Sequence, residues 1–244
     1  MNEGHAAFLA LERIRDLMEE EKLSFAEAWE ATRESNVFTT HTCVPAGIDL
    51  FDGTLVWEYL EEFCRLGGIS IEQLFSVGRK NAMDPNEKFS MAVAAMNLSA
   101  FRNAVSELHR LVSQDMWNGL WPNLPTAEVP ITNVTNGVHL PTMLNGDLAG
   151  LYDQYLQPDW RERYYEKKIW EQVHEIPDAE MWEAHRKRKK QLTIFVRQHA
   201  VALAQRRKAP SREIKQLEDI FDPDAFTIGF ARRFATYKRA TLLF

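Results

Sequence analysis

Apolar positions recur at helical spacing through most of the first half of the chain. Such spacing predicts a helix over residues 5–20, with Asn2 placed to cap it. Ser24 and Glu27 then form an S-x-x-E capping box, which opens a second helix that ends before Asn36. Further helices are predicted over 54–66, over 70–77, and over 87–117 as one long buried helix or two in tandem.

Two runs of β-branched and aromatic residues interrupt this helical pattern. The run VFTTHT at 37–42 predicts a strand that passes into a turn at Pro45-Ala46-Gly47. The run VPITNVTNGVH at 129–139 predicts a second strand, followed by a turn at Asn136-Gly137. We expect a boundary between two lobes near Asn136.

The second half of the chain predicts three helices, over 147–157, 178–208 and 212–220. After them, AFTIGF at 225–230 is continuously apolar, as in a buried strand of a parallel sheet. Arg232–Thr236 is then a loop, and Tyr237–Leu243 starts a helix. Strand, loop and helix are the opening half of a βαβ unit whose second strand is not in the chain. We therefore expect an internal fragment of a longer protein.

Composition narrows the class of protein. The chain has 244 residues, 45% of them hydrophobic, which is enough for a substantial core. A net charge of -6 argues against general nucleic-acid binding. No apolar run reaches a membrane span and no basic leader precedes one, so we expect a cytoplasmic protein. Cys43 and Cys64 belong to no metal or redox motif, and we expect both to be free and buried.

Positive charge is concentrated near the end of the chain. Arg232, Arg233, Lys238 and Arg239 follow the predicted strand, with no acid after Asp224. Ligands of open α/β sheets bind at the carboxyl ends of strands, where Arg233 and Lys238 would suit an oxyanion such as phosphate. The residues alone leave a second interpretation open, a solvated edge or ion pairs with acids elsewhere in the fold.

Other polar residues carry less information when taken one at a time. His41 ends its predicted strand and Asn136 belongs to the predicted turn, so each has an ordinary structural explanation. His5 and Glu3, ahead of the first helix, are weaker candidates still.

Two charged groups are best explained as solvated surface. The run HRKRKK at 185–190 lies within a predicted helix, beside acids and without interleaved aromatic residues that could stack on bases. Glu58, Glu61 and Glu62 follow helical spacing and do not form the opposed carboxylate pair of a glycoside hydrolase.

Four blocks together resemble the α-glucan phosphorylases, the glycogen and maltodextrin phosphorylase family, in its short bacterial and archaeal branch. They are MNEGHAAFLALERIR, VFTTHTCVPAGIDLF, the stretch from FSMAVAAMNLSAFRNAVSELH to VPITNVTNGVHLPTML, and FTIGFARRFATYKRATLLF. The blocks occur in family order and span nearly the whole chain.

The resemblance implies a helix-rich α/β fold, namely a piece of a two-lobed GT-B glycosyltransferase with incomplete Rossmann-like lobes. Residues 1–136 would be the later part of the N-terminal lobe, and 137–224 a helical connecting region. Residues 225–244 would be the first strand and helix of the C-terminal lobe.

The implied reaction moves a glucosyl unit from the end of an α-1,4-glucan to inorganic phosphate, giving α-glucose 1-phosphate with retention. By the family pattern, five residues belong to the sugar site. His41 contacts the glucosyl residue, Asn136 hydrogen-bonds a sugar hydroxyl, and Val105 lines the site. Tyr237 lies beside the glucosyl group, and His5 borders the sugar pocket.

The same pattern implies that Arg233 and Lys238 bind the substrate phosphate and that Arg232 lies near the phosphate of a pyridoxal phosphate cofactor. The cofactor lysine of the family lies downstream of the YKR block, so we expect it outside this chain and the chain alone to be inactive. The implied partners are glucan and phosphate, without nucleic acid or membrane, and a homo-oligomer is compatible with the family.

Two alternatives stay open at this stage. One is a nucleotide-sugar-dependent glucosyltransferase of the same architecture, such as a glycogen synthase, in which a similar basic pair binds a diphosphate. The other is a non-enzymatic helical binding protein whose HRKRKK run engages an acidic partner.

Overall fold

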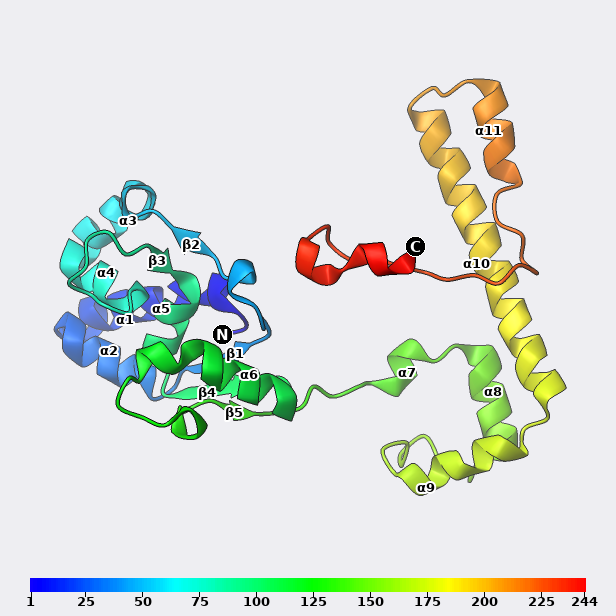
Figure 1. Ribbon diagram of the computed structural model, residues 1–244, viewed down its shortest axis with the longest axis horizontal. Coiled ribbons are helices and arrows are strands. Elements are labelled where there is room, and N and C mark those ends of the chain that lie inside the picture. Colours follow the sequence, from blue (N-terminus) through cyan, green and yellow to red (C-terminus); the bar gives the residue numbers. More distant parts are fainter. The chain divides into compact units, whose positions relative to one another are not determined.

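The computed structural model describes residues 1–244, which form two compact units, Met1–Gly137 and Val138–Phe244 (Figure 1). Each unit has its own cluster of buried apolar side chains. The predicted boundary near Asn136 lies beside this division, while the assignment of lobes and connecting region stays a prediction. The helix-rich α/β class is confirmed.

Unit 1, Met1–Gly137, alternates helices with short strands. Its helices are α1 (Phe8–Glu21), α2 (Phe25–Arg33), α3 (Gly53–Gly67), α4 (Ile71–Gly78), α5 (Met91–Asn97) and α6 (Glu107–Trp117). Its strands are β1 (Val37–Thr40), β2 (Leu50–Phe51), β3 (Phe89–Ser90), β4 (Phe101–Ala104) and β5 (Thr132–Asn133). Single 3-10 turns lie at Gly4–Ala6, Pro45–Gly47, Asn118–Leu120 and Thr126–Glu128.

A small parallel sheet organises unit 1. Its order is β1-β4-β5, and Figure 1 shows these strands side by side. Asn2 forms a further parallel bridge with Thr39 of β1. Because all these segments run in the same direction, their carboxyl ends lie along one edge of the sheet. β2 and β3 form a separate antiparallel pair.

The core of unit 1 lies between this sheet and the helices around it. Phe38 of β1, Leu11 and Ile14 of α1, and Phe89 of β3 are all essentially inaccessible to solvent. α5 is buried along almost its whole length, since Met91 to Met96 are inaccessible. The buried helix α5 therefore packs against the sheet as part of the core of unit 1.

Local capping explains where two helices begin. The N–H of Glu27 donates to the hydroxyl of Ser24 and the N–H of Ser24 donates to the Glu27 carboxylate, so the predicted capping box is confirmed. Ser70 and Gln73 form a second box at the start of α4. The predicted cap at Asn2 is wrong, because Asn2 pairs with β1 and α1 begins only at Phe8.

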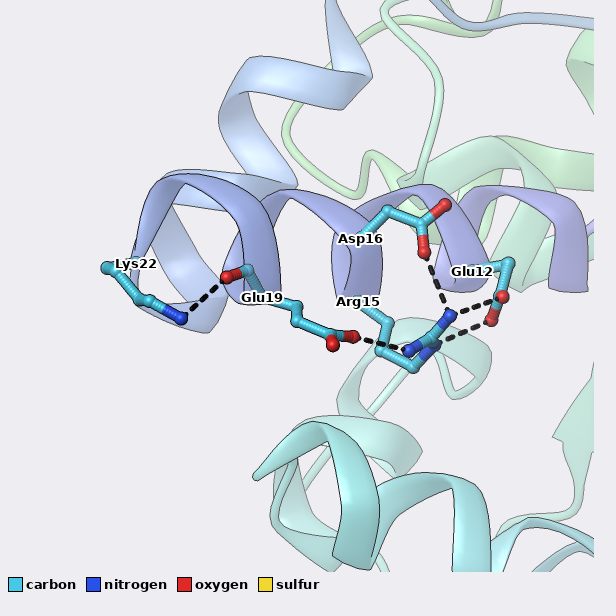
Figure 2. Close-up of polar contacts among 5 residues, drawn as sticks. All are labelled: Glu12, Arg15, Asp16, Glu19 and Lys22. Carbon is cyan, nitrogen blue, oxygen red and sulfur yellow. Dashed lines mark hydrogen bonds and ion pairs between the residues drawn. The ribbon is translucent and has the colours of Figure 1, made fainter.

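The exposed face of α1 carries a network of charges (Figure 2). Arg15 forms ion pairs with Glu12 at 2.7 Å, Asp16 at 2.8 Å and Glu19 at 2.9 Å. The hydrogen bond from Arg15 lowers the pKa of Glu12. Lys22, in the left-handed conformation at the helix end, donates to the carbonyl of Glu19 at 2.8 Å.

The prediction of one long helix, or two in tandem, over 87–117 is wrong in one respect. α5 and α6 are both present, but strand β4 separates them. The buried Arg102 of β4 donates to the carbonyl of Met96 at 2.9 Å, which folds the strand back on the end of α5. Burial lowers the pKa of Arg102 to about 10.

Unit 2, Val138–Phe244, is almost entirely helical. It contains α7 (Leu140–Met143), α8 (Gly146–Tyr155), α9 (Lys167–Trp170), α10 (Asp178–Arg206) and α11 (Ser211–Glu218), with 3-10 turns at Glu171–Glu175, Thr236–Lys238 and Ala240–Leu243. Leu156, Trp160 and Ile169 form its buried cluster. α11 packs beside α10, as Figure 1 also shows. The predicted helices over 147–157, 178–208 and 212–220 are confirmed.

Residues 225–230 do not form the predicted buried strand. The segment has no regular structure, and Phe226 is 91% exposed. A strand needs a neighbour for its backbone hydrogen bonds, and no segment pairs with this one. The helix predicted over Tyr237–Leu243 is likewise replaced by two short 3-10 turns.

Smaller expectations about the cysteines, the charged residues and membrane-spanning helices can also be compared with the structure. Cys43 is exposed, so the expectation that both cysteines are buried holds only for Cys64. The run 185–190 lies within α10 and is largely exposed, and its Lys187 pairs with Asp147 of α8 at 2.5 Å. Glu58, Glu61 and Glu62 are exposed on α3. Crossing a bilayer would require a long apolar helix, and the structure contains none.

Candidate functional site

Three of the predicted site residues follow the strands of the parallel sheet. His41 comes directly after β1, Val105 directly after β4, and Asn136 three residues after β5. The N–H of Asn136 donates to the carbonyl of Val105 at 3.2 Å. Parallel strands end at the same edge, so the structure brings these residues together where α/β sheets bind ligands.

The chain at Asn136 has no regular secondary structure, and the turn predicted at Asn136-Gly137 is absent. The N–H groups of Val134 and Asn136 continue the pairing of β5 with β4 by donating to Ala104 and Val105. Pairing with the neighbouring strand therefore overrides the turn preference of Asn-Gly.

The first residues of the chain reach the same edge. The N–H of Glu3 donates to the carbonyl of Thr39 at 2.9 Å, which continues the parallel bridge at Asn2. His5 lies in the 3-10 turn that follows and is exposed. Nε2 of His41 lies 2.6 Å from Oδ1 of Asn2. The turn that carries His5 thus directly follows residues that bind the His41 loop.

Glu3 fixes the loop that carries His41. Its carboxylate accepts hydrogen bonds from the N–H of His41, from the N–H of Thr42 at 2.8 Å and from the Thr42 hydroxyl at 3.1 Å. The backbone of Glu3 has φ 63° and ψ 167°, a region occupied almost only by glycine. Such a conformation costs about 1–3 kcal/mol, which the carboxylate bonds offset.

His109, in the first turn of α6, joins two loops of the site. The N–H of Val105 donates to Nδ1 of His109 at 3.4 Å, so the ring proton is on Nε2, which donates to the carbonyl of Thr42 at 3.2 Å. Ser106 caps the helix and accepts from the N–H of His109 at 3.1 Å, which fixes the position of the buried ring.

The edge therefore offers several hydrogen-bonding groups. The imidazole of His41 and the carboxamide of Asn136 are exposed, and Val105 is half-buried between their loops. Imidazoles, carboxamides and backbone groups can each donate to or accept from hydroxyls. This set suits a polyhydroxylated ligand.

The remaining predicted residues belong to unit 2. Arg232 and Arg233 are exposed, and Lys238 lies in a 3-10 turn with its Nζ 4.8 Å from the centre of the Tyr237 ring. None of the ion pairs in the structure involves these basic residues. Their charges are therefore available to an anion.

Sequence reasoning missed Glu3 as an anchor and did not consider His109. Glu3 contacts residues 38 and 39 positions away, and His109 contacts a carbonyl 67 positions away. The one local signal is the spacing of Ser106 and His109, since a helix-capping serine fixes the residue three positions on.

Comparisons with a protein family and with individual proteins both find carbohydrate phosphorylases. A sequence profile of the family described as carbohydrate phosphorylase matches residues 1–219. The whole chain aligns with the maltodextrin phosphorylase of Thermococcus litoralis at 40% identity, and with the glycogen phosphorylases of Mycobacterium tuberculosis at 38% and Aquifex aeolicus at 35%.

The chain spans 28% of the length of the first two relatives and 34% of the third. The basic residues from Arg232 to Arg239 lie beyond the profile match and inside the three pairwise alignments.

Proposed function

Because the chain belongs to the carbohydrate phosphorylase family, we propose that its protein phosphorolyses α-1,4-glucans such as glycogen, starch and maltodextrin. In this reaction the terminal glucosyl unit passes to inorganic phosphate with retention, giving α-glucose 1-phosphate. The observation that carries the proposal is the alignment of the whole chain with maltodextrin and glycogen phosphorylases at 35–40% identity.

We assign the chain to a two-lobed GT-B architecture. Residues 1–136 are the later part of the N-terminal lobe, 137–224 a helical connecting region, and 225–244 the start of the C-terminal lobe. The parallel sheet of unit 1, with its candidate residues at the carboxyl edge, supports a Rossmann-like lobe.

The carboxyl edge of unit 1 is the proposed glucosyl site. His41 and Asn136 hydrogen-bond sugar hydroxyls, Val105 lines the site and His5 borders it. Tyr237 lies beside the glucosyl group. The exposed hydrogen-bonding side chains of unit 1 support these roles, since a sugar presents hydroxyls that both donate and accept.

Arg233 and Lys238 are the proposed ligands of the attacking phosphate. As the glycosidic bond breaks, positive charge develops at the anomeric carbon while the phosphate anion approaches it. A guanidinium and an ammonium that hold the anion in place stabilise this arrangement and orient the attack. The absence of ion pairs at these residues supports the role.

The family uses pyridoxal phosphate. Arg232 fits its phosphate, because an exposed guanidinium without an ion-pair partner can bind phosphate through two parallel hydrogen bonds. When bound, the cofactor would supply a phosphate group capable of proton transfer, which this chain's own side chains do not provide. Arg232 would orient that phosphate and balance its charge.

The test is an activity assay on the protein expressed from its complete reading frame with pyridoxal phosphate. We expect release of glucose 1-phosphate from maltodextrin that depends on inorganic phosphate, and no glucosyl transfer from a nucleoside diphosphate glucose. Absence of phosphorolysis in the cofactor-loaded protein would contradict the proposal.

The same assay tests the phosphate ligand. We expect Arg233→Ala to lower kcat/KM for phosphate by about 10²-fold or more, because a charge-assisted contact made at the reacting centre is lost. The control is Arg212→Ala, which removes an exposed and unpaired guanidinium from the first turn of α11. Equal losses in the two variants would show that Arg233 has no specific role.

A further inference from the structure

We infer that Glu3 and His109 are positioning residues that hold the residues proposed to contact the sugar, His41 and Val105. The inference rests on the proposed function for the identity of the ligand. The geometry behind it belongs to unit 1 alone. Neither residue is assigned a part in the chemistry.

Thr42 is the point at which the two residues act together. Its N–H and its hydroxyl donate to the carboxylate of Glu3, and its carbonyl accepts from Nε2 of His109. All three polar groups of one residue are thus bound by two side chains from distant parts of the chain. We call this arrangement the Thr42 clamp.

The backbone of Glu3 supports a specific role for its carboxylate. Glycine would adopt φ 63° and ψ 167° at little cost, whereas any side chain makes the conformation unfavourable. A glutamate is compatible with this position because its carboxylate accepts hydrogen bonds from His41 and Thr42. The Glu3 side chain therefore provides hydrogen-bond acceptors for the His41 loop, which a glycine lacks.

His109 couples the loops after β1 and β4. Its ring spans from the N–H of Val105 to the carbonyl of Thr42, and it must accept at Nδ1 while donating at Nε2. The carbonyl of Val105 in turn accepts from the N–H of Asn136. Without the imidazole, the loops that carry His41 and Val105 would lose this connection, and the distance between the two residues would no longer be fixed.

The expected consequence is a loss of turnover with little effect on phosphate binding. Misplacing a substrate by about 1 Å can cost about 10²-fold in rate. The proposed phosphate ligands, Arg233 and Lys238, belong to unit 2, whereas every hydrogen bond of the clamp lies within unit 1. Relaxing the clamp should therefore lower kcat and leave KM for phosphate unchanged.

The first experiment measures the clamp without reference to activity. In the full protein, hydrogen exchange of the His41 and Thr42 amides should accelerate by about tenfold or more in Glu3→Gln, which keeps the shape and removes the charge of the acceptor. Glu20→Gln, an exposed carboxylate on α1, is the matched control. Protection of α5 amides shows that both variants are folded. Unchanged exchange at His41 and Thr42 would overturn the clamp.

The second experiment distinguishes the two hydrogen bonds of His109, the bridge between Val105 and Thr42, from a role of its ring in packing alone. Gln at position 109 can donate to Thr42 and accept from Val105, whereas Leu fills space and does neither. We expect kcat to fall about tenfold or more in His109→Leu and in Glu3→Gln, with KM for phosphate unchanged, and His109→Gln to recover most of it. An equal loss in His109→Gln and His109→Leu would overturn the bridge.

The two experiments distinguish this inference from the proposed function. If the wild-type protein releases no glucose 1-phosphate, the proposed function is wrong and the role toward sugar falls with it. The exchange measurement then still decides whether Glu3 and His109 hold Thr42.

Discussion

Glu3 and Gly4 are neighbours with opposite requirements. Glu3 carries a side chain on a backbone that favours glycine, because its carboxylate holds the His41 loop. Gly4 is buried where a side chain has no room: a Cβ would lie 2.8 Å from the backbone nitrogen of Ala92 and 3.0 Å from the carbonyl carbon of Met91. The turn after Gly4 therefore lies directly on α5.

We expect Gly4→Ala to lower the free energy of unfolding of unit 1 by about 1–3 kcal/mol, because the clash is with backbone atoms that cannot rotate away. Urea denaturation measures the effect. Gly119→Ala is the control, since its Cβ would meet only Lys80 Nζ at 3.7 Å. Equal stability of the two variants would mean that α5 shifts to accommodate the methyl group.

At the scale of single residues, the sequence predicted the exposed members of the site better than their supports. His41, Val105 and Asn136 are recognisable because strand ends and family blocks point to them, although their roles stay predictions. Glu3 and His109 act through contacts across 39 and 67 positions, which no local pattern records. The contacts of Glu3 and His109 can be identified only once the pairing of the strands is known.

At the scale of elements, the predicted helices were recovered where short-range chemistry defines them. The boxes at Ser24 and Ser70 join residues three positions apart, so the sequence alone contains the whole interaction. Strands depend on partners instead. β4 was hidden in an Ala-rich stretch because its pairing with β1 is not local, and 225–230 was predicted as a strand although nothing pairs with it.

The cap of α2 provides an element-scale prediction. We expect Ser24→Ala to lower the free energy of unfolding by about 1 kcal/mol, because the N–H of Glu27 loses its acceptor. Ser24→Asp should retain most of the stability, since aspartate is also a good cap. Urea denaturation of the three proteins tests the order, and an Asp variant no better than the Ala variant would contradict it.

The same cap predicts a pH dependence. Hydrogen bonds from the hydroxyl and then the N–H of Ser24 lower the pKa of Glu27 from its usual 4.5. A lowered carboxyl pKa contributes stability that is present above pH 4.5 and lost as the pH falls through the folded-state pKa. The difference between wild type and Ser24→Ala should therefore narrow in acid. A constant difference from neutral pH to pH 3 would count against an ionised Glu27 in the cap.

At the scale of the whole molecule, the two units differ in the size of their buried apolar cores. Unit 1 has one continuous core that joins the sheet to its helices, whereas unit 2 buries a small aromatic cluster and leaves large apolar side chains exposed from Phe226 onward. The cores share no residue. A probe buried in unit 1 should therefore report on the core of that unit.

Cys64 is such a probe and Cys43 is its internal reference. Cys43 is exposed in the loop after His41, while Cys64 is 1% exposed in the core of unit 1 and burial raises the pKa of its thiol. Both effects protect Cys64, because the thiolate is the reactive form.

At neutral pH we expect a disulfide reagent to modify one thiol of the 244-residue chain at once. The second should react only as fast as unit 1 opens. Cys43→Ser should remove the fast phase and Cys64→Ser the slow one, whereas two fast thiols in the wild type would mean that the core around Cys64 is open.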